Sequence, residues 1–167
     1  MKTQKLLVIV AISCVLFGVS GGAAMAELNC CGDGVLRNET FDGTLRVTGD
    51  EPCVIISSTI QGDIRVINLP YVLLLNNNVG GNIEVDGNAG NGVANVIANT
   101  VLGEGLFVRD QEIAYVIENE SLTGDINVNR NIKAFVQKNI AAQDIICRSN
   151  TDLSSFLNLA GGSLNCD

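Results

Sequence analysis

A repeat of about nineteen residues constrains this chain more than any other feature of its sequence. A short unit, in which an apolar residue, a variable residue and a valine or cysteine follow one another, returns along the chain in steps of 19, 19, 23, 20, 19 and 19 residues. Each unit alternates apolar and variable positions, which is typical of a strand with one buried face. The units are residues 45–47, 64–66, 83–85, 106–108, 126–128, 145–147 and 164–166.

A second apolar segment follows in most repeats, and a polar residue follows it at a nearly constant offset. Stacked coils place equivalent residues about 4.8 Å apart, so an asparagine can donate to one neighbour and accept from the other. Asparagine also tolerates the left-handed backbone of a corner. A general preference of asparagine for loops would not explain the constant offset. We therefore predict an asparagine ladder made of Asn77, Asn99, Asn119, Asn139 and Asn158.

The repeat predicts an all-β fold, a right-handed parallel β-helix (β-solenoid) of about seven coils of 19–23 residues with disulfide-stapled ends. Two strands in nineteen residues leave no room for the helix of a leucine-rich repeat, and the six-residue period of a left-handed solenoid is missing. Crossovers between parallel strands favour the right-handed sense. We expect the longest step to hold a surface loop over residues 87–93, and a second polar series at Asp50, Asn88, Gln111, Asn131 and Asn150.

The first residues are typical of a secretory signal peptide. A basic start is followed by an apolar run over residues 6–19 and by Ala24-Met25-Ala26. The run is short for a membrane span, which needs roughly 20 residues, although an N-terminal anchor is the alternative interpretation. We expect a signal peptide over residues 1–26 and a single β-helix domain over residues 27–167. The mature protein is then secreted, either outside the cell or into the periplasm if the source has an outer membrane.

The charge of the chain argues against two classes of partner. Its formal net charge is −8 at pH 7. Nucleic acids and anionic membranes are bound through lysine and arginine, so an acidic chain is not expected to bind either. We accordingly predict no nucleic-acid partner and no membrane insertion after the signal peptide is cleaved.

Cysteines outside the signal peptide are expected to form disulfides, because exported proteins are oxidised. Cys147 and Cys166 occupy the same position in consecutive coils, within disulfide range. Cys53 is expected to pair with Cys30 or Cys31, of which we name Cys31 as the candidate. A strained vicinal Cys30–Cys31 bond is the alternative. Five cysteines follow the signal peptide, and this odd number leaves one thiol that could link copies into a homo-oligomer. Zinc is not expected, because the chain has no histidine and no Cys-x-x-Cys pair.

The coil pattern resembles that of a group of uncharacterised secreted proteins, mostly bacterial, with right-handed β-helix repeats. The residues that carry the resemblance are 79–85, the Cys147-Arg148-Ser149-Asn150 coil, the closing segment 161–166 and the Cys53-Val54-Ile55 opening. The resemblance covers about residues 40–167. It implies the fold and the end disulfides, and it implies no activity.

Carboxylates at the corners are the remaining chemical feature. Asp63, Asp125 and Asp144 each precede a first strand, and Asp125 and Asp144 are expected to be neighbours at about 4.8 Å. Solvated corner residues are the simplest interpretation, with Asp125 and Asp144 as weak candidates for a calcium site. Arg130 and Arg148 are too generic to be assigned a catalytic role. We assign no catalytic or cofactor-binding residue and no cofactor other than this possible calcium.

The sequence therefore favours a non-enzymatic secreted structural or surface-interaction protein. We expect flat polar faces that dock an extracellular-matrix, cell-surface or glycan partner. The alternative is a small carbohydrate-active or glycan-binding β-helix protein, similar to a polysaccharide lyase, which would require clustered carboxylates beside a basic residue.

Overall fold

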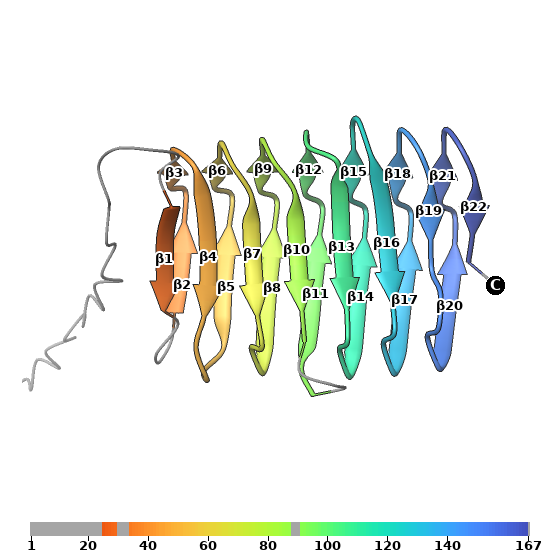
Figure 1. Cartoon of the computed structure of the whole chain (residues 1–167), viewed down its shortest axis with the longest axis horizontal. Helices are drawn as coiled ribbons and strands as arrows, with labels where there is room; N and C mark the ends of the chain where they lie inside the picture. The colour runs from red at the N-terminus through yellow and green to blue at the C-terminus, as the bar shows by residue number, and fades with distance from the viewer. Residues whose placement is uncertain (1–24, 30–33, 88–90, 167) are drawn as a thin grey trace, which may run out of the picture.

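The computed structural model describes residues 25–29, 34–87 and 91–166, with side chains described from Gly34 onward. The chain winds into coils that stack along one axis, from the N-terminal coil at the left of Figure 1 to the C-terminal coil at the right. All regular structure in the described residues is strand. The strands of successive coils pair in parallel to form three sheets. The predicted parallel β-helix of about seven coils is confirmed.

Sheet A holds the first strand of each coil. In the order in which they pair, its strands are β1 (Met25–Asn29), β4 (Thr44–Thr48), β7 (Ile64–Ile67), β10 (Ile83–Asp86), β13 (Gly105–Arg109), β16 (Asp125–Asn129), β19 (Ile145–Ile146) and β22 (Leu164–Asn165). Most of the predicted signal peptide lies outside the described residues, and its last two residues, Met25 and Ala26, lie in β1.

Sheets B and C complete each coil. The strands of sheet B are β2 (Gly34–Arg37), β5 (Cys53–Ile56), β8 (Tyr71–Leu75), β11 (Val93–Ile97), β14 (Ile113–Ile117), β17 (Lys133–Gln137) and β20 (Asp152–Phe156). Those of sheet C are β3 (Thr40–Phe41), β6 (Thr59–Ile60), β9 (Asn78–Val79), β12 (Thr100–Val101), β15 (Glu120–Ser121), β18 (Ile140–Ala141) and β21 (Leu159–Ala160). The sequence predicted two strands per coil. The third strand has only two residues, too few to show a period of its own.

The register follows the repeat units. Leu45 pairs with Ile64, Ile64 with Ile83, and Ile83 with Leu106, although the last step is the longest. The extra residues therefore leave the register of the stack intact. They lie between β10 and β11, where residues 88–90 are outside the described part of the chain.

The core is a set of apolar columns that run through the stack. Inward positions of all three sheets are buried in the coils before the last one, and Leu45, Ile64, Ile83 and Leu106 form one such column with no exposed surface. Burial of these side chains is the main favourable contribution to folding, because each removes apolar surface from water. The repeated apolar position of each coil is thus what holds the next coil in place.

The asparagines of the predicted ladder hydrogen-bond to one another across the coils. The backbone N–H of Asn77 donates to Asn99 Oδ1 at 3.0 Å, and the same bond runs from Asn99 to Asn119 at 3.0 Å and from Asn119 to Asn139 at 2.9 Å. The last bond runs from Asn139 to Asn158 at 3.0 Å. Ser58 donates its N–H to Asn77 and begins the series. The side-chain amides also donate to backbone carbonyls one coil back, so buried polar groups at this corner are satisfied.

The left-handed residue of this corner is the one before each ladder asparagine. Ala98, Glu118, Lys138 and Leu157 have φ values of 53°, 58°, 55° and 56°. The ladder asparagines are not among the residues with positive φ, although asparagine tolerates that conformation. An L-amino acid with positive φ costs free energy. The hydrogen bonds of the ladder asparagine that follows it hold the backbone in this conformation.

The C-terminal end carries the predicted disulfide. Cys147 and Cys166 are bonded, with their Cα atoms 4.5 Å apart, and they join the last two coils of sheet A. Cys53 also takes part in a disulfide. Cys30 and Cys31, its predicted partners, lie outside the described residues.

Candidate functional site

The stack has one outward face for each sheet, and the three faces differ in chemistry. Alternate residues of every strand point outward, as the burial patterns show. The outward residues of sheet C are mostly polar in the first coils. Those of sheet A are mostly charged residues or amides, such as Arg46, Arg65, Glu84 and Asn127, and the apolar exceptions are Ile67, Phe107 and Ile146. Sheet B differs from both.

The outward side of sheet B is an almost continuous apolar surface over five consecutive coils, from β5 to β17. We call this surface the apolar face. Its residues are half-buried, and the parallel register aligns them in three columns across the strands. They are Val54, Ile56, Tyr71, Leu73, Leu75, Val93, Ile97, Ile113, Tyr115, Ile117 and Phe135.

Two aromatic rings lie side by side on the apolar face. Tyr115 of β14 is paired in register with Phe135 of β17. Their ring centroids are 4.8 Å apart and the ring planes are inclined by only 8°, so the rings are stacked. Stacking of this kind fixes both side chains in one orientation. The face is therefore flat and ordered at this point.

Charged residues lie at the two ends of the apolar face. Arg37 lies outward on β2, in the first coil of the sheet, whereas Lys133 and Asp152 lie at the start of β17 and β20. Asn95 of β11 is the polar side chain in the middle. Among the described outward residues of β5, β8, β11 and β14 there is no charged side chain.

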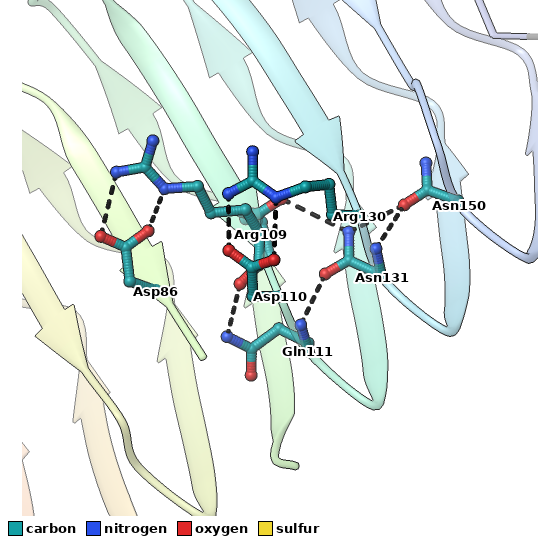
Figure 2. Close-up of polar contacts among 8 residues, drawn as sticks. Asp86, Arg109, Asp110, Gln111, Arg130, Asn131 and Asn150 are labelled. Carbon is teal, nitrogen blue, oxygen red and sulfur yellow. Dashed lines mark hydrogen bonds and ion pairs between the residues drawn. The ribbon is translucent and has the colours of Figure 1, made fainter. Parts of the chain in front are cut away.

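Ion pairs bridge successive coils at the corner where the strands of sheet A end (Figure 2). Arg109 at the end of β13 pairs with Asp86 at the end of β10. Asp110, the next residue, pairs with Arg130 of the following coil at 2.6 Å. In both pairs the guanidinium contacts two carboxylate oxygens, the geometry that arginine favours. These charges are therefore used to align coils.

The ion pairs change the acidity of their members. Hydrogen bonding from Arg130 lowers the pKa of Asp110, and the same bond raises the pKa of Arg130. Hydrogen bonding to Asp86 raises the pKa of Arg109. Each shift favours the charged form, so these residues are not poised to exchange protons near neutral pH.

A second polar ladder lies directly beside these ion pairs (Figure 2). The N–H of Gln111 donates to Asn131 Oδ1 at 3.0 Å, and the N–H of Asn131 donates to Asn150 Oδ1 at 3.0 Å. These residues belong to the second polar series that the sequence predicts, whereas Asn88 lies outside the described residues. Leu69 occupies the position of this series between Asp50 and Asn88, and its apolar side chain is buried.

The corner aspartates bind backbone N–H groups of the next coil. Asp125 Oδ1 accepts from the N–H of Asp144 at 2.9 Å, and Asp144 Oδ1 accepts from the N–H of Ser163 at 2.6 Å. Asp63 does the same for Asn82 at 2.9 Å. Within the described residues, no group of three or more histidine, cysteine, aspartate or glutamate side chains could hold a metal ion. A calcium ion needs six to eight oxygen ligands. The calcium site at Asp125 and Asp144 therefore stays a prediction.

A hollow of about 620 Å³ lies beside Asp125 on the outside of the stack. Its lining combines two carboxylates, a hydroxyl, an amide and one aromatic ring. None of the residues that line it is basic, so the arginine or lysine expected of a polysaccharide lyase is not in its wall. The lining residues are Leu102, Gly103, Glu104, Phe107, Thr123, Asp125 and Gln143.

The apolar face is the feature that the sequence reasoning missed. We expected flat polar faces, and for sheet B this expectation is wrong. The signal was present in segments 54–56 and 72–75, which are apolar at every position instead of alternating. A continuous apolar run indicates a strand covered on both sides. Among the described residues, only the inward side of sheet B is covered.

Comparison with known proteins finds no matching family model, no similar curated protein and no matching solved structure. Across the described residues, no helix is long and apolar enough to cross a membrane. The fold and its surfaces are therefore the evidence from which function is inferred. They define a β-solenoid with one apolar outer face.

Proposed function

We propose that this protein is a non-enzymatic secreted structural or surface-interaction protein, and that the apolar face of sheet B is its contact surface. The observation that carries the proposal is that sheet B presents apolar side chains outward over five consecutive coils. Soluble proteins rarely leave a contiguous apolar surface of more than a few hundred Å² in water unless it meets a partner.

The extent of the face supports this function. Five strands about 4.8 Å apart, each about 16 Å long, cover roughly 400 Å² in projection. The face is rigid, because every strand in it is hydrogen-bonded to a neighbour on both sides. A rigid surface loses little conformational entropy when it binds, so the contact area is used efficiently.

A matched pair of variants tests the proposal. Leu73→Lys with Ile117→Lys places two charges on the apolar face, whereas Leu122→Lys with Ile140→Lys places the same charges at exposed positions outside sheet B. We expect the wild type and the second variant, loaded from dilute solution so that the apolar face is free, to be retained on an octyl-substituted resin, and the first variant to elute early. Far-ultraviolet circular dichroism checks that both variants keep their strands. Equal retention of the two variants would refute the proposal.

A second candidate function is glycan binding in the hollow beside Asp125, as in the carbohydrate-active alternative. The observation in its favour is that Phe107 lies in the same wall as the Glu104 and Asp125 carboxylates. An aromatic ring beside hydrogen-bonding groups is a common way to hold a sugar. Binding to a panel of polysaccharides that is abolished by Glu104→Gln and Phe107→Ala would establish it. Unchanged binding in both variants would exclude this hollow.

A further inference from the structure

We propose that the apolar face packs against the same face of a second copy, so that the protein is a homodimer of two face-to-face β-helices. This inference rests on the proposed function and names the partner of that surface. Two flat sheets with apolar outer sides pack about 10 Å apart, as in β-sandwiches. A second copy offers a surface of matching shape and chemistry, because the parallel register keeps the face flat over many coils.

The available area is sufficient for a dimer. Val35 and Phe156 extend the apolar surface onto β2 and β20, and both side chains are about half exposed. Seven strands about 4.8 Å apart and about 16 Å long give roughly 540 Å² for each copy in projection. Two copies then bury about 1,100 Å², which exceeds the roughly 1,000 Å² that specific interfaces need.

The distribution of charge favours a second copy over a charged partner. The chain carries a net charge of −8, but the described outward residues of the four strands from β5 to β14 carry no charge. Two copies therefore meet here without placing carboxylates opposite each other. A polyanion or an anionic membrane finds no cationic residue at the centre of the face to bind.

A two-fold axis parallel to the strands keeps the charges at the periphery of the contact. It lays the first coil of sheet B in one copy over the last coil in the other, so that Arg37 lies over Phe156, which shares its column in the register. It also places Tyr115 opposite Leu73 of the second copy, because β8 and β14 are equally distant from the central strand β11. Each large ring then faces a smaller aliphatic side chain, and the two-fold symmetry closes the assembly.

Native mass distinguishes the proposal from its alternatives. Free thiols are first alkylated without reduction, and the full chain is studied by sedimentation velocity at concentrations up to about 1 mM, where even weak complexes form. We expect the wild type and Leu122→Lys with Ile140→Lys to have twice the monomer mass. Leu73→Lys with Ile117→Lys should weaken the dimer at least about a hundredfold, because its buried ammonium groups lose their hydration unpaired.

Three outcomes would overturn the inference: a wild type that stays monomeric, a dimer that survives the charges on the apolar face, or a dimer seen only as a disulfide-linked band on a non-reducing gel. The failure of this inference differs from a failure of the proposed function. If the wild type is monomeric but its retention on octyl resin still depends on Leu73 and Ile117, this inference fails while the apolar face remains an accessible contact surface. If neither property changes in the face variant, both proposals fail.

Discussion

Asn119 and Asn139 are joined by two hydrogen bonds that converge on one oxygen. The N–H of Asn119 donates to Asn139 Oδ1 at 2.9 Å, and Asn119 Nδ2 donates to the same atom at 3.1 Å. Both side chains are buried. This contact is the unit of the asparagine ladder, and it connects one coil to the next at the corner between sheets B and C.

Replacement of Asn119 should be strongly destabilising. Asn119→Ala removes the acceptor of the Asn99 N–H and leaves Val96 O without its side-chain donor. Because unsatisfied buried groups are costly, we expect the free energy of unfolding to fall by about 3 kcal/mol. Urea unfolding measures this change, and Asn78→Ala, at an exposed position of β9, should cost less than about 0.5 kcal/mol. Equal effects of the two substitutions would contradict a structural role for the ladder.

Removing the hydroxyl of Ser121 should stabilise the folded protein. Its Oγ is the buried side-chain atom of the described residues that has no hydrogen-bond partner. Ser121→Ala is therefore expected to raise the free energy of unfolding by about 1 kcal/mol. Ser58 is the matched control, because it is equally buried and its hydroxyl donates to Ile56 O at 3.1 Å. Ser58→Ala should destabilise the protein, and a destabilising Ser121→Ala would show that its hydroxyl is satisfied in solution.

The pair between Asp110 and Arg130 should add stability at neutral pH and lose it in acid. Arg130 lowers the pKa of Asp110 below its ordinary value of 3.8, so the folded state binds this proton less readily than the unfolded state. The contribution is therefore complete above that value and is lost as the pH falls through the lowered pKa. It should be small and sensitive to salt, because the Arg130 side chain is 56% exposed.

A double-mutant cycle measures this coupling. Asp110→Asn, Arg130→Gln and the double variant are unfolded with urea at neutral pH and again in strong acid. We expect a stabilising coupling at neutral pH that disappears in acid and shrinks at high salt. A coupling that persists in strong acid would show that the ion pair is not its source.

Loss of the disulfide should loosen the C-terminal coil. Cys147 is buried, whereas Leu164, which lies two residues before Cys166, is 53% exposed. An inner coil packs against a coil on each side, whereas the last coil packs against one coil only. The disulfide therefore compensates for the packing contacts that the last coil lacks. Replacing both cysteines by serine should cost about 3 kcal/mol for a loop of this size. Hydrogen exchange should locate the loss in β20–β22, and uniform acceleration over all coils would contradict this end-cap role.

The ladder shows how far the sequence could be interpreted. The constant offset of Asn77, Asn99 and Asn119 from the preceding strands predicted which residues would be stacked, because one coil repeats the geometry of the last. The offset could not show that the preceding residue, such as Glu118, is the one in the left-handed conformation. That depends on how the chain turns between sheets B and C, which periodicity alone does not specify.

The corner aspartates illustrate the same limit. Their spacing predicted that Asp125 and Asp144 would be neighbours, and a hydrogen bond from the N–H of Asp144 to Asp125 joins them. Sequence alone left calcium ligation and simple solvation open. The structure shows a third use of these carboxylates, as acceptors for the backbone of the next coil.

The sequence by itself determined the β-helix, the coil boundaries and the residues of the asparagine ladder, because each coil must bury the same positions against its neighbour. Only the tertiary structure decided which of the remaining apolar residues stay on the surface. Leu73 and Leu74 are adjacent and equally apolar, yet Leu74 is fully buried and Leu73 lies on the apolar face. Successive residues of a strand point to opposite sides. The described residues cover one side of sheet B and leave its outward side exposed.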